Sequence, residues 1–126
     1  MTNYGLMNSS RQQVIAGLGG FNYTDVVSVD PFDAFQLPSN AGIVHIHFSV
    51  DEVFDTGTQI SLYHNGDELL ANQNLTAKDV IDIGPTGQVY PHITTVKFQL
   101  NQLSTKGSAR FLVEYVVIGR TQFTED

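Results

Sequence analysis

Two histidines separated by a single residue, His45 and His47, have the clearest capacity for chemistry in this sequence. They lie in GIVHIHFSVDE, residues 42–52, where apolar residues recur at every second position. In a β-strand, residues i and i+2 project from the same face, so the two imidazoles would stand side by side. Neutral imidazole is a common ligand of zinc and related ions, and two on one face could share an ion. A third or fourth ligand would still be required.

Two other residues, later in the chain, could complete such a set of metal ligands. Glu52 follows His47 by five residues, and His92 ends the stretch PTGQVYPH. The set His45, His47, Glu52 and His92 resembles in outline the ligands of cupin metalloenzymes, which are also jelly rolls. That resemblance implies a metal-dependent enzyme as one alternative function.

The strand pattern itself favours a plainer interpretation of the histidine pair. Alternation leaves both imidazoles on the wetter face or beneath a subunit contact, together with Ser49, and nothing on that face indicates the dry pocket that a catalytic metal needs. On this interpretation we expect no metal. The buried row would then consist of Val44, Ile46, Phe48 and Val50.

The amino-acid composition argues against several classes of function. The 126 residues include thirteen acidic and six basic side chains, a net charge of −7 that opposes binding to nucleic acid or to an anionic membrane. No cysteine is present, so thiolate catalysis and disulfides are excluded. The start of the chain predicts neither a signal peptide nor a membrane anchor. No nucleophile motif occurs, so covalent hydrolase chemistry is not expected, and we expect no cofactor. The stretches GLGG (17–20) and GPTG (84–87) are expected to be turns.

The elements that must position these residues are strands. A period of two predicts strands over six segments, and Asn65-Gly66 is typical of a hairpin turn. Within 67–80 we expect at most a turn of helix. The sequence therefore predicts an all-β fold, a two-sheet β-sandwich that is jelly-roll-like, formed by residues 14–126 with an extended N-terminal arm, residues 1–13. The six predicted strands are 24–29, 33–38, 43–50, 58–63, 92–100 and 110–118.

The last of these strands is unusual because it is apolar on both faces except at Glu114. Such a pattern is typical of a central strand, or of one covered by another subunit.

The C-terminal part of the chain resembles a known family. GSARFLVEYVVIGRTQFTED, residues 107–126, contains the pattern A-R-h-h-V-E-Y-h-V-x-G-R, where h is hydrophobic, followed by a short polar acidic tail. FQLPSNAGIVHIHFSVDEVFDTGT, residues 35–58, contains a second pattern, in which L-P-x-x-A-h-h leads into a long strand and an F-D-x-G-T turn. Both patterns resemble those of small virion proteins of tailed bacteriophages, the head decoration or cement proteins.

This resemblance implies a non-catalytic sandwich that is made in the host cytoplasm and located in the virion, on the outer surface of the capsid. Its partners would be the major capsid protein and further copies of itself, as a homotrimer, with no nucleic acid and no membrane. Aromatic residues and arginine are favoured anchors in protein interfaces. We therefore expect partner contacts from the arm and the closing segment, through Tyr4, Leu6, Met7, Arg11, Arg120 and Phe123.

A third alternative is a carbohydrate-binding β-sandwich of a virion fibre. Tyrosine rings could stack on sugars, although the absence of tryptophan weakens this hypothesis. The candidate tyrosines are Tyr23, Tyr63, Tyr90 and Tyr115.

Overall fold

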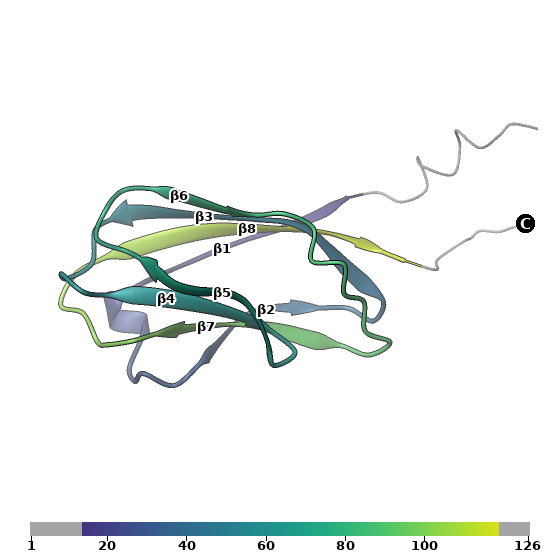
Figure 1. The fold of residues 1–126 in the computed structure, drawn as a ribbon, viewed down its shortest axis with the longest axis horizontal. Helices are drawn as coiled ribbons and strands as arrows, with labels where there is room; N and C mark the ends of the chain where they lie inside the picture. Colours follow the sequence, from purple (N-terminus) through teal and green to yellow (C-terminus); the bar gives the residue numbers. More distant parts are fainter. Residues whose placement is uncertain (1–13, 119–126) are drawn as a thin grey trace, which may run out of the picture.

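The computed structural model describes residues 14–118, which form two stacked layers of β-strands (Figure 1). The elements are β1 (Ile15–Asn22), the 3-10 helix η1 (Tyr23–Asp25), β2 (Phe32–Leu37), β3 (Ala41–Glu52), β4 (Gln59–His64), β5 (Asp67–Asn74), β6 (Val80–Ile83), β7 (Thr94–Leu100) and β8 (Ser108–Val117). Within residues 14–118, no helix is long and apolar enough to cross a membrane.

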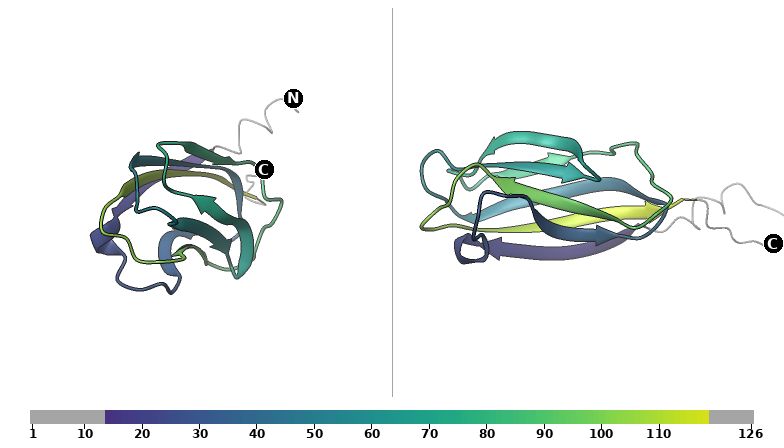
Figure 2. Two further views of the ribbon diagram at one scale, coloured as in Figure 1. Left: turned by 60° about the vertical axis from the view of Figure 1, so that its left-hand side comes forward. Right: turned by 90° about the horizontal axis from the view of Figure 1, so that it is seen from below.

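The strands are arranged as two antiparallel sheets. Sheet A has the order β1-β8-β3-β6, and sheet B has the order β2-β7-β4-β5. Consecutive strands alternate between the sheets in β1 to β3 and again in β6 to β8, while β4 and β5 form a hairpin within sheet B (Figure 2). Eight strands connected in this way form a jelly roll. The predicted all-β, two-sheet sandwich is therefore confirmed, and β8 is the central strand that its sequence indicated.

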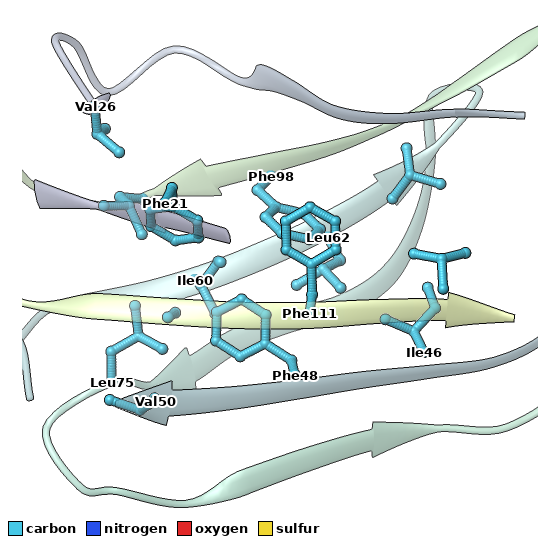
Figure 3. Close-up of a cluster of buried hydrophobic side chains, with 14 of the residues drawn as sticks. Phe21, Val26, Ile46, Phe48, Val50, Ile60, Leu62, Leu75, Phe98 and Phe111 are labelled. Atoms are coloured by element: carbon cyan, nitrogen blue, oxygen red, sulfur yellow. The ribbon is translucent and has the colours of Figure 1, made fainter. Parts of the chain in front are cut away.

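The space between the sheets is filled by aromatic and aliphatic side chains (Figure 3). Phe98 lies near the centre, with its ring centroid 4.9 Å from that of Phe111 and 5.7 Å from that of Phe48, in edge-on arrangements. Such edge-on pairs add about 0.5–1.5 kcal/mol to the free energy gained by burial alone. The phenylalanines connected by these ring contacts are Phe21, Phe32, Phe48, Phe54, Phe98 and Phe111.

Strand β3 shows the expected alternation over most of its length. Ile46, Phe48 and Val50 are buried, and His45 and His47 face outward. The prediction was wrong at Val44, which is only half-buried, because Ile43 takes the buried position. Against β8, Ile43 is opposite Tyr115 and His45 is opposite Glu114, so Val44 is the extra residue of a β-bulge. The bulge changes which positions face inward.

The glycines of 17–20 are part of β1, not a turn as predicted. Two of them, Gly17 and Gly19, make room for aromatic rings. An ideal Cβ on Gly17 would lie 2.1 Å from Cε1 of Phe35, and one on Gly19 would lie 2.4 Å from Cζ of Phe111. Side chains at these two positions would displace the rings of Phe35 and Phe111.

Two further segments differ from the sequence prediction. Residues 24–29 form the end of η1 and a loop, because Asn22 and Asp25 complete a capping box around the helical turn. Residues 67–74 are strand β5, where the adjacent Leu69 and Leu70 both pack against the core. The register against β4 shifts twice, once at Leu69 and once at Asn72, whose φ is +54°, and these irregularities interrupt the alternation of the strand. The Asn65-Gly66 turn that precedes it is confirmed, with positive φ at both residues.

Candidate functional site

The outer face of sheet A carries the main concentration of chemically capable side chains among residues 14–118. Strand β3 lies between β8 and β6, as Figure 1 shows, and presents His45 and His47 outward. In the sheet register His45 is opposite Glu114 of β8, and His47 is opposite Asp82 of β6. Each imidazole is thus flanked by a carboxylate from a neighbouring strand. We refer to His45, His47, Asp82 and Glu114 as the histidine–carboxylate cluster.

The four side chains of this cluster are in close contact. His47 Nδ1 lies 2.6 Å from Asp82 Oδ1, and His47 Nε2 lies 3.4 Å from Glu114 Oε1. His45 spans the same two acids, with Nε2 3.9 Å from Asp82 Oδ1 and Nδ1 3.9 Å from Glu114 Oε1. The centroids of the two imidazole rings are 3.9 Å apart. The two rings therefore lie together between the two carboxylates.

This arrangement has two chemical capacities. Protonated imidazoles would form ion pairs with both acids, and neutral imidazoles would offer nitrogen lone pairs to a metal ion. Suitable ligand atoms of His45, His47 and Asp82 all lie within 4.8 Å of one another. Both histidine side chains are 35% exposed, so the cluster lies on an open face and not in an enclosed pocket.

The structure brings only part of the cupin-like set together. Glu52 is at the end of β3 opposite Ser108, five residues and therefore about 16 Å beyond His47 along the strand. His92 follows β6 in the connection to β7, where its ring stacks on Tyr90. Asp82 and Glu114 take their places beside the histidines. The signal for these two acids is the strand order, which the local sequence does not reveal.

A further histidine, His64, is fully buried at the end of β4. Its Nε2 lies 2.7 Å from Thr94 Oγ1, and its Nδ1 has no hydrogen-bond partner among the described residues. Burial lowers the pKa of His64, and the nearby carboxylate of Asp67 opposes this only in part. The hydroxyl of Tyr90 donates to Asp67 across 2.6 Å, which raises the pKa of that tyrosine. His64 is therefore a neutral part of the interior.

Sheet B has a shallow open groove of about 270 Å³ on its outer face. Two of its side-chain amides are engaged by the backbone: Asn101 accepts from the Gln59 amide and donates to the Gly57 carbonyl, and Gln99 donates to the Val29 carbonyl. The groove is lined by Val29, Ser61, Tyr63, Asn72, Gln99, Leu100 and Asn101.

The tyrosines of the carbohydrate hypothesis are distributed over the molecule. Only Tyr63 lines this groove. Tyr23 belongs to η1, Tyr90 is bonded to Asp67, and Tyr115 packs its ring 6.1 Å from that of Phe35. The four rings therefore do not make a common stacking platform.

One end of sheet A exposes apolar side chains. Strand β1 begins and β8 ends there, with Ile15 opposite Tyr115 (Figure 1). Val14 is 54% exposed, and Ile15, Val89 and Ile118 are each about two-fifths exposed. The predicted contact residues in the arm and the closing segment lie outside the described residues, namely Tyr4, Leu6, Met7, Arg11, Arg120 and Phe123.

No protein-family model matches the chain, and no curated protein matches it. Three solved structures do. A chain of the cyanophage Pam1 capsid asymmetric unit matches with a TM-score of 0.61 and 16% identity, over 84% of this chain and 86% of that one. A chain of the acidic stable capsid of Helicobacter pylori bacteriophage KHP30 matches with a TM-score of 0.62 and 13% identity, over 82% and 86%.

The capsid of Ralstonia phage GP4 contains a chain that matches with a TM-score of 0.63 and 18% identity, over 86% of both chains. In all three matches the covered shares are nearly equal, so this chain and its counterparts have similar lengths. At such low identity the likeness establishes the fold and no more: this chain has the same jelly-roll fold as small chains found in three phage capsid structures.

Proposed function

We propose that this protein is a virion structural protein that binds the outer surface of a phage capsid and stabilises its capsomers, as a head decoration or cement protein. The observation that carries this proposal is the likeness to chains of three phage capsids over 82–86% of this chain. The similar lengths support it, because each match covers most of this chain and 86% of the capsid chain. Jelly rolls also occur in lectins and cupins, so the fold alone leaves these alternatives open.

The distribution of side chains supports a non-catalytic role. The interior between the sheets is occupied by a continuous apolar core, and the histidine–carboxylate cluster lies on an open face. A cupin-like enzyme would need its metal in a dry, shaped cavity. Neither Glu52 nor His92 belongs to the cluster, so the geometry gives that alternative no support.

We propose that the apolar end of sheet A forms part of the contact with the major capsid protein or with other copies in a homotrimer. It is defined by Val14, Ile15, Val89 and Ile118, of which all but Val89 adjoin the arm or the closing segment in the sequence. Exposed apolar residues that gather at one place are typical of interaction surfaces. An interface of about 1,600 Å², repeated around a shell, would be sufficient to hold neighbouring capsomers together.

The test is co-sedimentation of the purified full-length protein with heads of its phage that lack this protein. We expect saturable binding, and heads that withstand a higher temperature once the protein is bound. Ile118→Glu combined with Val14→Glu should weaken binding at least tenfold. Val27→Glu is the matched control, since Val27 is 85% exposed in the loop after η1, away from this end.

Failure of the wild-type protein to bind the heads would overturn the proposal. Equal weakening by Val27→Glu would instead show that the apolar end has no special part in attachment. Light scattering of the protein in solution tests the proposed homotrimer independently of the heads.

A further inference from the structure

We propose that the histidine–carboxylate cluster is a binding site for one divalent transition-metal ion, with zinc as the best match, held by His45, His47 and Asp82. This inference is independent of the proposed role in a capsid. It rests on the positions of three ligand atoms on two neighbouring strands and on the environment of the fourth side chain, Glu114.

The ligand atoms lie near the spacing that such an ion requires, all within 4.8 Å of one another. Zinc bound at 2.0–2.1 Å in a tetrahedron places its ligand atoms about 3.3 Å apart. Asp82 Oδ1 lies 2.6 Å from His47 Nδ1 and 3.9 Å from His45 Nε2, distances on either side of that value. Small side-chain rotations would therefore bring all three into the coordination shell, without any movement of the sheet. All three side chains are partly exposed, which leaves a path for the ion and a coordination position for water.

Glu114 lies where it can orient the histidines. It approaches the ring nitrogens that face away from Asp82, at 3.4 Å from His47 Nε2 and 3.9 Å from His45 Nδ1. When the opposite nitrogen binds a metal, this nitrogen carries a proton and donates to an acceptor. A carboxylate in that position fixes the tautomer and increases the basicity of the ligand. Glu114 is thus a positioning residue for both imidazoles.

The donor set selects among metals. Two imidazole nitrogens and one carboxylate oxygen suit zinc, nickel, cobalt and copper, whereas calcium and magnesium favour sites made mainly of oxygen ligands. The whole sequence contains four histidines and no cysteine. Two of the histidines are His64, which is buried, and His92, which lies away from the cluster. Among residues 14–118, a transition metal therefore has one evident site.

Binding should also hold β6 to the rest of sheet A. His45 and His47 belong to β3, and Asp82 belongs to β6, a four-residue strand at the edge of the sheet. An ion bound by both strands stabilises the native state by mass action, because the unfolded chain lacks the preformed site. The apparent melting temperature should consequently rise with the zinc concentration.

The experiment uses the full chain without an affinity tag, dialysed first against a chelator and then against chelator-free buffer. Isothermal titration with ZnCl₂ at pH 7.5 measures the stoichiometry and the affinity, and titrations with CaCl₂ and MgCl₂ test selectivity. We expect one zinc per chain, with no detectable calcium or magnesium binding. His45→Ala and His47→Ala should each weaken zinc binding more than about 100-fold, and Glu114→Gln should weaken it about 10- to 100-fold.

His92→Ala is the matched control and should bind zinc as the wild type does. Melting curves recorded with and without zinc provide a second measurement, since a zinc-dependent shift should disappear in His47→Ala and persist in His92→Ala. Wild-type protein without zinc binding at 100 µM added metal would overturn the proposal, as would unchanged affinity in both His45→Ala and His47→Ala.

Discussion

The interior between the sheets and the outer face of sheet A are built in part from the same strand, but they have different physical roles. On β3, Phe48 is 1% exposed, while the adjacent His47 has a side chain that is 35% exposed. One face of the strand is packed against aromatic rings of both sheets, so its residues determine the free energy of unfolding. The other face carries the histidine–carboxylate cluster on an open surface. The comparison predicts that, without bound metal, substitutions on the outer face change the free energy of unfolding much less than substitutions in the interior.

The largest effect is expected from truncating the centre of the interior. Phe98→Ala removes a fully buried ring that contacts Phe48 and Phe111, and leaves a cavity between the sheets. We expect the free energy of unfolding to fall by about 3–5 kcal/mol. Urea denaturation followed by circular dichroism measures it. Phe98→Leu, which preserves more of the volume, should cost distinctly less; a loss below 1 kcal/mol for Phe98→Ala would contradict the described packing.

A smaller effect is expected from the buried histidine when the pH is lowered. Burial lowers the pKa of His64 in the folded protein, so the unfolded chain binds a proton first as the pH falls through 6.5. The free energy of unfolding should therefore decrease below pH 6.5, by at most about 1.4 kcal/mol per pH unit from this group, until the pH reaches the folded pKa.

Urea midpoints at pH 7.5 and pH 5.0 test this effect. His64→Gln, which can still bond to Thr94, should reduce the difference between the two midpoints, and His92→Gln should not. Asp55 does not interfere in this interval, because hydrogen bonds from Thr105 lower its pKa below the ordinary 3.8. An unchanged pH dependence in His64→Gln would show that the interior histidine is not the responsible group.

The smallest effect on stability is expected from the outer face. His47→Ala, measured in the presence of a chelator, should change the free energy of unfolding by less than about 1 kcal/mol, because it removes a partly exposed side chain and its surface contacts with Asp82 and Glu114. The same urea experiment measures it. A loss of unfolding free energy comparable to that of Phe98→Ala would mean that the cluster stabilises the fold as much as the interior does. That result would contradict the comparison of the two faces.

The sequence predicted the fold where alternation and turn chemistry are strong. The alternating residues of β3, the Asn65-Gly66 turn and the aliphatic pattern of β8 were sufficient to indicate an all-β sandwich. Strand β1 was missed because its glycines are selected by the rings of Phe35 and Phe111, which come from elsewhere in the sequence. Two register shifts in β5 conceal its alternating pattern, and β6, with four residues, is too short to show a clear alternation.

The sequence predicted only the two histidines of the histidine–carboxylate cluster. A strand puts His45 and His47 on one face whatever surrounds it, so the pair follows from spacing alone. Asp82 and Glu114 join the pair because β6 and β8 flank β3, and this order depends on long-range pairing. Glu52 was predicted as a ligand because it follows His47 closely along the chain, and His92 because the set resembles cupin ligands in outline. Neither reason places a side chain near the middle of β3.

The position of β8 has a consequence for how the protein is made. This strand lies between β1 and β3, so sheet A is in two separate pieces until β8 enters. All the other described strands leave the ribosome earlier, yet only the β4–β5 hairpin among them pairs neighbouring strands of the chain. Long-range pairing of this kind folds slowly. Sheet A therefore cannot be completed before β8 has been synthesised, whereas sheet B, which lacks β8, can pair all its strands earlier.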